Sequence, residues 1–134
     1  MVLCHMYPMK IDFLAVGDIV TEPFIRLLEA NVTCDEHESC TISMHWGDKI
    51  PYESAEVARA VGNAANAAVA AARLGLSSAL VTDIGDDEVG KGDVEQLRKE
   101  GVETAYVTTH PGMKSNYHYV LWFESERTIL VRHE

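Results

Sequence analysis

Short apolar runs alternate along the chain with segments of helical character. Ile11–Asp18 is a short, mostly apolar run that is ended by glycine, which is typical of a buried strand. Ser77–Gly85 predicts a second buried strand, and Val102–His110 predicts a third. Because helix-like segments separate these strands, their order favours an α/β domain with a parallel sheet.

The first helix-like segment, residues 63–73, is unusually rich in alanine: seven of its eleven residues are of this type. Alanine has the highest helix propensity, and Gly75 stands where a helix commonly ends in glycine. The second segment, Asp86–Gly101, begins with acidic residues and ends with basic ones followed by glycine, which suits the helix dipole at both ends. The small side chains of the first helix should let it sit close to the sheet.

One segment before these helices has the alternating pattern of a half-buried strand. In Ser39–Asp48, one predicted face carries Ile42, Met44 and Trp46, and polar residues alternate with them. Pro23–Ala30 is ambiguous, because it fits either a short helical turn or the start of an excursion from the core.

The C-terminal part of the chain predicts a β-hairpin. Ser115–Ser125 and Arg127–His133 read as two strands around a tight turn at Glu124–Arg127, and aromatic residues line the first strand. We expect a small antiparallel sheet here, joined by the strand at Ser39–Trp46.

The composition and net charge of the chain make some classes of binding partner and some cellular locations unfavourable. A chain of 134 residues with 47% hydrophobic residues suits one globular domain. The formal net charge of -10 disfavours nucleic acid and anionic membranes as partners. Neither a signal peptide nor a transmembrane segment is evident. Three cysteines, Cys4, Cys34 and Cys40, are too few for a disulfide scaffold, so we expect reduced thiols and a cytoplasmic protein.

Two asparagines stand at the start of the alanine-rich helix. Asn63 and Asn66 are three residues apart and should share a helix face, beside the free N–H groups of the first turn. Carboxamides both donate and accept hydrogen bonds, which suits a neutral polyhydroxy ligand. The alternative is that Asn63 only caps the helix while the alanines only pack.

Several motifs in one consistent order resemble the first half of a ribokinase-like (PfkB family) carbohydrate kinase. They are the stretches VGNAANAAVAAARLG, VTDIGDDEVGK, EGVE and ERTIL. The resemblance covers residues 11–134. It implies part of a three-layer α/β core with a mainly parallel sheet, plus a small antiparallel β lid at residues 31–50 and 115–134. It also implies ATP and Mg²⁺ as cofactors of the full enzyme, which transfers the ATP γ-phosphoryl group to a sugar or nucleoside hydroxyl.

By this resemblance, Glu22, Gly62 and Asn66 contact the substrate hydroxyls, with Asn63 beside them. Asp18 is an alternative to Glu22 as the substrate carboxylate. The first glycine of the family's pair is replaced by Val61, and the usual aspartate by Glu22, which is one methylene longer. These departures leave the hinge at the pair and the identity of the sugar open.

The Gly-x-Asp-x-x-Gly turn of the family falls on Gly85, Asp87 and Gly90. Immediately after it, the sequence GKGD (residues 90–93) imitates the Gly-x-Gly-Asp of the family's catalytic aspartate. Its position is that of an ordinary helix, so Asp93 is interpreted as a solvated acid of the first turn. We therefore place no catalytic residue in this sequence and regard the ATP-binding and catalytic half as absent from it.

Two further patterns suggest other sites. Residues 85–92 approach a P-loop, but they lack the hydroxyl that follows the lysine and carry three acids. Cys34, His37, Cys40 and His45 invite a zinc site, but their spacing is short for one, and we predict no metal.

Three functional hypotheses remain after this survey. The chain is the sugar-binding N-terminal portion of a kinase and is inactive alone, a stand-alone sugar-binding or regulatory module, or a half-enzyme completed by a separate chain. We also expect a homodimer formed through the lid strands, because a partial domain leaves sheet edges and apolar surface uncovered.

Overall fold

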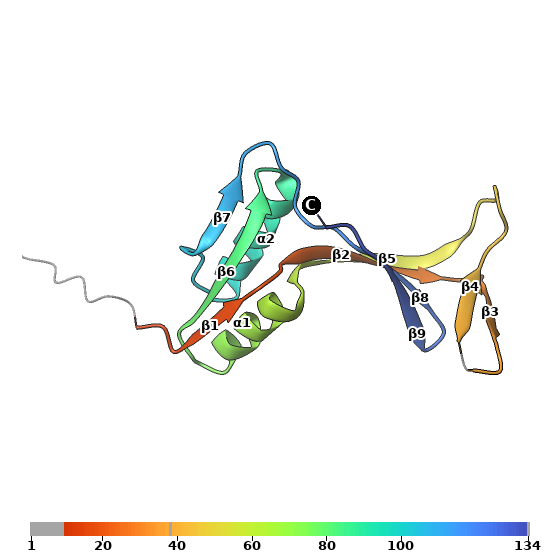
Figure 1. Cartoon of the computed structure of the whole chain (residues 1–134), viewed down its shortest axis with the longest axis horizontal. Coiled ribbons are helices and arrows are strands. Elements are labelled where there is room, and N and C mark those ends of the chain that lie inside the picture. Colours follow the sequence, from red (N-terminus) through yellow and green to blue (C-terminus); the bar gives the residue numbers. More distant parts are fainter. Residues whose placement is uncertain (1–9, 38, 134) are drawn as a thin grey trace, which may run out of the picture.

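The computed structural model of the chain describes residues 10–37 and 39–133, and this part divides into a core and an elongated β-sheet arm (Figure 1). The core holds a parallel sheet in the order β1-β6-β7. Its strands and helices are β1 (Phe13–Val16), α1 (Asn63–Arg73), β6 (Ser78–Gly85), α2 (Glu88–Lys99) and β7 (Val107–His110). The predicted alternation of strands and helices is therefore confirmed, as are both helices.

The arm, called the lid below, is a four-stranded sheet in the order β5-β2-β8-β9 together with the separate hairpin β3-β4. Its strands are β2 (Val20–Leu27), β3 (Asn31–Cys34), β4 (Cys40–Ser43), β5 (Tyr52–Val61), β8 (Tyr119–Phe123) and β9 (Glu126–Leu130). The hairpin of β8 and β9 confirms the C-terminal prediction, with its turn at Glu124 and Ser125. β2 and β5 run continuously from the core into the lid (Figure 1).

One prediction about the lid strands is wrong, and one ambiguity is resolved. Pro23–Ala30 starts the excursion from the core and is no helical turn, because most of it belongs to β2, which pairs with β5 on one side and β8 on the other. The predicted strand at Ser39–Trp46 is only β4; it pairs with β3 and does not join β8 and β9. Trp46 is fully exposed in a turn instead of half-buried. Pairing between distant strands overrides local pattern in these segments.

The prediction of reduced thiols also fails in part, because Cys34 and Cys40 form a disulfide. The two residues face each other across the antiparallel β3-β4 pair, so the bridge closes the hairpin at its turn. Asp35 supports the same turn by accepting hydrogen bonds from the backbone N–H groups of His37 and Ser39.

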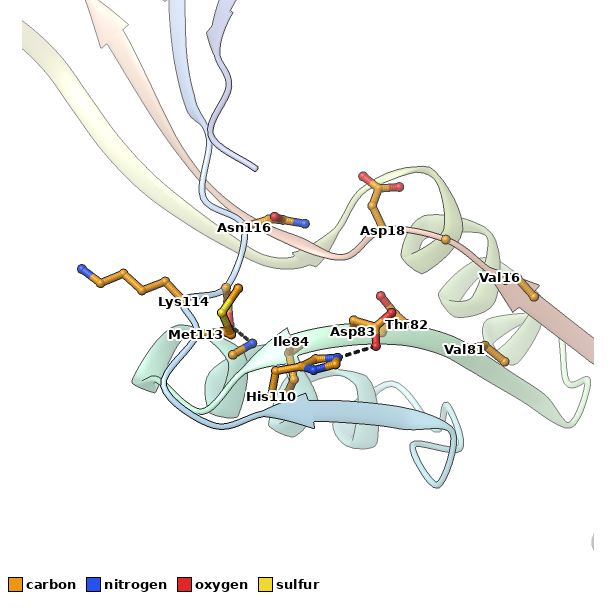
Figure 2. A pocket seen from close by; sticks show the side chains of 13 residues that line it. Val16, Asp18, Val81, Thr82, Asp83, Ile84, His110, Met113, Lys114 and Asn116 are labelled. Atoms are coloured by element: carbon orange, nitrogen blue, oxygen red, sulfur yellow. Dashed lines mark hydrogen bonds and ion pairs between the residues drawn. The ribbon is translucent and has the colours of Figure 1, made fainter. Parts of the chain in front are cut away.

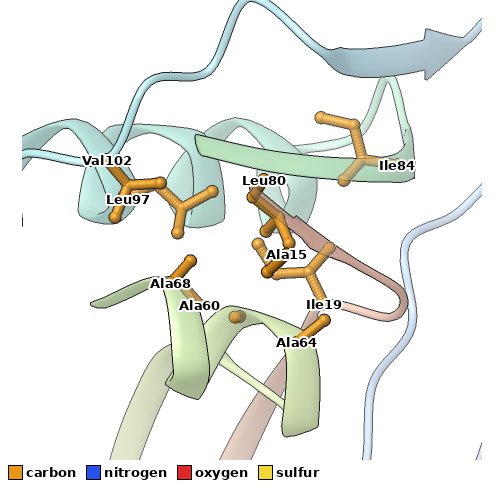
Figure 3. Close-up of a cluster of buried hydrophobic side chains, with 10 residues drawn as sticks. Ala15, Ile19, Ala60, Ala64, Ala68, Leu80, Ile84, Leu97 and Val102 are labelled. Atoms are coloured by element: carbon orange, nitrogen blue, oxygen red, sulfur yellow. The ribbon is translucent and has the colours of Figure 1, made fainter. Parts of the chain in front are cut away.

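The alanines of α1 pack directly on the sheet, as predicted. Ala64, Ala65, Ala68 and Ala71 are buried. The first three belong to the main hydrophobic cluster together with Leu80 of β6, and Figure 3 shows Ala64, Ala68 and Leu80 in it. Because these side chains are single methyl groups, the helix axis lies close to the strands. The Ser78 hydroxyl donates to the backbone carbonyl of Ala68, which adds a polar contact inside this interface.

The opposite face of the core sheet is open. β1 was predicted to be buried, but only Ala15 of this strand is buried, whereas Leu14 and Val16 are 53% and 71% exposed. Alternate residues of a strand point to opposite faces, and both helices pack on the face of Ala15. The strand prediction is thus confirmed, and the prediction of burial on both faces is wrong for the described residues.

Candidate functional site

A cavity of about 320 Å³ lies at the carboxyl ends of the parallel strands, where the lid leaves the core. This is the usual position of ligands in open α/β sheets. Its polar lining consists of Asp18, Thr82, Asp83, His110, Lys114, Ser115 and Asn116 (Figure 2). His110 and Asp83 form a pair, with 2.7 Å between Nε2 and the carboxylate Oδ1.

The start of α1 is held at the edge of this cavity by close backbone packing. Gly62 is the N-cap of α1 and has a φ of 105°. A Cβ atom on Gly62 would lie 3.1 Å from Oδ2 of Asp18, so the glycine allows Asp18 to approach the helix start. The structure thus brings together two predicted residues, Gly62 and the alternative carboxylate Asp18.

The backbone on both sides of Val61, the first position of the glycine pair, has positive φ angles. Val61 does not have a positive φ; its neighbours Ala60 and Gly62 do, at 54° and 105°. Ala60 is almost fully buried in this conformation, which is unfavourable for a residue with a Cβ. The sequence showed valine in place of glycine at position 61, but it did not indicate that Ala60 is the residue with the unfavourable φ angle.

The two asparagines of α1 are exposed and make no helix cap. The N-cap, Gly62, has no side chain, and no side-chain cap bond is present, so the interpretation of Asn63 as a cap is wrong. Among the described residues, neither carboxamide has a hydrogen-bond partner. Asn66 lines a second cavity, of about 590 Å³, together with Arg59 and Arg73, whereas Asn63 lines neither cavity.

Glu22 lies on β2, in the lid, and its carboxylate is already partnered. The Nδ1 atom of His118 lies 3.2 Å from Oε1 of Glu22, and both side chains are largely buried. No hydrogen bond or ion pair joins Glu22 to Gly62 or Asn66 among the described residues. Sequence reasoning did not select His118, because its only signal was an alternating position in the aromatic strand.

The Gly-x-Asp-x-x-Gly turn connects β6 to α2, and its hydrogen bonds hold the segment that leads into β8. Asp87 caps α2 by accepting from the backbone N–H of Gly90, and it also accepts from the hydroxyl and backbone N–H of Ser115. Burial raises the pKa of Asp87, but these hydrogen bonds outweigh it and leave the pKa below its usual value. Cβ atoms on Gly85 and Gly90 would collide with residues 113–115 or with the Gly85 carbonyl. Glycine is therefore required at both positions, because neighbouring atoms lie too close to leave room for a Cβ atom.

Asp93 contradicts the interpretation of a solvated first-turn acid. It is fully buried in the second turn of α2, where Oδ1 accepts from the Thr21 hydroxyl at 2.6 Å and from the Ala60 N–H at 2.8 Å. Burial raises its pKa despite these bonds and the nearby positive charge of Arg59. The helical spacing of Gly90, Asp93 and Leu97 on one buried face was the signal that could have revealed it.

The start of α2 is unsuited to a triphosphate, and the described residues contain no cluster of metal ligands. At the start of α2, Asp87 occupies the helix cap and Glu88 is an exposed acid, so an anion would be repelled. In residues 10–37 and 39–133, no three acidic, histidine or cysteine side chains converge as metal ligands. Cys34 and Cys40 are joined to each other, which removes two of the four zinc candidates. No helix in this part of the chain is long and apolar enough to cross a membrane.

A parallel sheet that ends at a polar cavity, with a β-sheet lid rising from the same end, is the arrangement in which many α/β proteins bind small molecules. Residues 34–133 match the family model of the pfkB family carbohydrate kinases. The chain belongs to this family, and the resemblance inferred from the sequence motifs is confirmed.

Curated relatives with similar sequences are sugar kinases. A 2-dehydro-3-deoxygluconokinase from Thermoproteus tenax is 37% identical over 59 residues, which is 44% of this chain and 18% of the relative. A ribokinase from Bacillus subtilis (strain 168) is 36% identical over 70 residues, which is 52% of this chain and 24% of the relative. The matches thus span a quarter or less of each of these two relatives.

Solved structures of sugar kinases share the fold. Arabidopsis thaliana ribokinase, in complex with ribose and ATP, has a TM-score of 0.67 and 20% identity, covering 90% of this chain and 35% of that one. Halothermothrix orenii fructokinase has a TM-score of 0.64 and 19% identity, covering 92% of this chain and 38% of that one. The described part of the chain is therefore a partial ribokinase-like α/β fold.

Proposed function

We propose that this chain supplies the sugar-binding portion of a pfkB-type kinase that transfers the ATP γ-phosphoryl group to a sugar or nucleoside hydroxyl. The observation that carries the proposal is the unpartnered pair of carboxamides at the first turn of α1, on Asn63 and Asn66. A helix start has free N–H groups, and exposed amides beside them suit hydroxyl groups. The family relationship supplies the reaction type.

In the proposed mode of binding, the ligand lies between the lid and the start of α1. Asn66 and Asn63 exchange hydrogen bonds with its hydroxyls, Gly62 allows close approach of the backbone, and Glu22 accepts a hydrogen bond from a hydroxyl group on the lid side. Asp18, at the edge of the strand-end cavity, is the alternative acceptor. Each of these contacts orients a hydroxyl group, which is the contribution of positioning to catalysis.

The described residues do not fit ATP with Mg²⁺, so no transfer step is assigned to them. The Gly-x-Gly-Asp at residues 90–93 cannot supply the base, because Asp93 is fully buried and bonded to Thr21 and Ala60. The proposal is therefore that these 134 residues bind sugar without phosphorylating it. A stand-alone binding module and a half-enzyme completed by a separate chain are the alternatives.

The proposed assembly is a homodimer through the lid in the cytoplasm. β8 has neighbours on both sides, so the aromatic strand is unsuited to pair with another chain, whereas β9 and β5 are sheet edges. Every residue of β9 is exposed, and an edge strand of this kind can recruit a second copy. Light scattering on dilute protein tests this: a monomer with a cooperative melt would contradict it.

Two assays on the 134-residue chain test the function. Calorimetry with ribose, fructose, 2-dehydro-3-deoxygluconate and nucleosides should detect binding of one of them. A coupled assay for ADP release, with ATP and Mg²⁺, should show no turnover with any of them. Binding without turnover supports the proposal. Turnover would overturn the inactive-portion hypothesis, and failure of the folded chain to bind any of these compounds would overturn the sugar-binding role.

A further inference from the structure

His118 is a buried imidazole whose two nitrogen atoms have different surroundings. Nδ1 lies 3.2 Å from the Oε1 atom of Glu22, while Nε2 is shielded from solvent and has no hydrogen-bond partner among the described residues. The ring of His133 packs edge-on against it, with 5.0 Å between the ring centres. A buried polar atom without a partner is rare and requires an explanation.

The backbone fixes this pair in place. Thr21 and Tyr117 form a parallel bridge between the start of β2 and the segment before β8, and the N–H of His118 donates to the carbonyl of Thr21. The next residues along the two strands, Glu22 and His118, therefore lie side by side. The side chain of Thr21 bonds to Asp93 on the α2 side, so Glu22 points to the opposite face of the lid.

We propose that His118 is a positioning residue for Glu22, and that it acts by donating its Nδ1–H to Oε1. The contact holds one carboxylate oxygen and leaves Oε2 to accept a hydrogen bond from a hydroxyl group of the ligand. This inference rests on the proposed sugar-binding role of Glu22. It also accounts for glutamate at this position, because an aspartate would fall about 1.5 Å short of the imidazole.

The geometry selects one tautomer of the neutral ring. With the proton on Nδ1, the ring donates to a carboxylate and only the lone pair of Nε2 lacks a partner. With the proton on Nε2, a buried N–H would lack an acceptor and the Nδ1 lone pair would face the Glu22 carboxylate. The second arrangement leaves two mismatched polar contacts, so the Nδ1–H form is the one that fits.

Nitrogen NMR of the 134-residue chain tests the tautomer without any ligand. At about pH 8, where an ordinary histidine is neutral, long-range ¹H–¹⁵N spectra should show the proton of His118 on Nδ1. His110 is the internal control, because it faces Asp83 through Nε2 and should be protonated there. Glu22→Gln should shift the His118 Nδ1 signal and leave the His110 signals unchanged. An Nε2–H form of His118 would overturn the proposal.

Ligand binding tests the positioning role. With D-ribose as the probe, His118→Leu should weaken binding about tenfold, the effect of losing one charge-assisted hydrogen bond. His118→Asn keeps an N–H donor near the position of Nδ1 and should restore most of the affinity, which a purely structural role would not predict. Equal binding by all three proteins would refute the positioning role. If the wild-type chain binds no ribose, the choice of ribose as substrate fails, and the tautomer result alone decides the role of His118.

Discussion

Asp93 offers the sharpest test of how the core holds the lid. Its Oδ1 atom accepts hydrogen bonds from Thr21 at the start of β2 and from Ala60 at the end of β5, which are the two strands that run into the lid. Asp93→Ala would leave two buried donors without an acceptor, and each such group costs about 1–3 kcal/mol. We expect a loss of about 3 kcal/mol in the free energy of unfolding. For a chain of this size, that loss lowers the melting temperature by about 10 °C.

Two variants at Thr21 distinguish loss of the Thr21–Asp93 hydrogen bond from a general disruption of core packing. Thr21→Val removes the hydroxyl donor and should cost about 1 kcal/mol, whereas Thr21→Ser keeps the hydroxyl and should cost less. Because Asp93→Ala already removes the acceptor, adding Thr21→Val to it should cost little more. Urea unfolding of the single and double variants measures the coupling. Strictly additive effects, or an Asp93→Ala protein as stable as wild type, would refute this account.

The pH dependence gives a second measurement on the same residue. Burial raises the pKa of Asp93 above its ordinary value of 3.8, so the folded protein keeps a proton that the unfolded chain has released. Its contribution to stability is therefore greatest below pH 3.8 and declines as the pH rises through the raised pKa. Asp93→Asn does not titrate and keeps a side-chain oxygen as acceptor. The stability of Asp93→Asn relative to wild type should increase across this window; a constant difference would contradict the pKa assignment.

Three further predictions concern other parts of the structure. Gly90→Ala should destabilise the protein by about 2 kcal/mol or more, because the added Cβ atom would collide with backbone. Gly92→Ala should be near neutral, because its Cβ atom would meet only the flexible end of Arg59. Thermal melts that show equal stability for the two variants would contradict this. Glu124→Asn should stabilise the hairpin turn by about 0.5 kcal/mol because Glu124 has a φ of 53°, and urea unfolding would detect any loss instead. A thiol titration of the unfolded chain should find two more thiols after reduction than before, and equal counts would exclude the Cys34–Cys40 disulfide.

The core was predictable because local and global signals agree there. The alanine helix, its glycine stop and the strand that follows it each have one dominant pattern, and α1 and β6 follow those patterns. The lid was less predictable, because β2 and β5 owe their structure to pairing between segments far apart in sequence. No local pattern revealed that Pro23–Leu27 would be an inner strand between β5 and β8.

The candidate site was predictable in part for the same reason. Helix spacing placed both asparagines in the first turns of a helix, and α1 begins at Asn63 as that pattern indicated. The motif named Gly62 as a substrate contact, and its place as the helix cap came only from the structure. Two sets of hydrogen bonds could not be predicted, because they depend on strand register and helix packing, which one sequence does not display. They join Glu22 to His118, and Asp93 to Thr21 and Ala60. Asp93 was taken to be solvated because its position is that of an ordinary helix, but that position did not show that Asp93 lies on the buried face of α2.

The most direct test of the sugar-binding account is a calorimetric comparison of three proteins: wild type, Asn66→Ala and, as a control, Asn31→Ala in the lid hairpin. Removing the Asn66 carboxamide should cost about 1–2 kcal/mol of binding, or about 5- to 30-fold in affinity for the sugar that the wild type binds. Asn31→Ala should bind as wild type does, and all three should show the same melt. If Asn66→Ala binds the sugar as tightly as wild type, the ligand does not lie at the start of α1, and the proposed site is wrong.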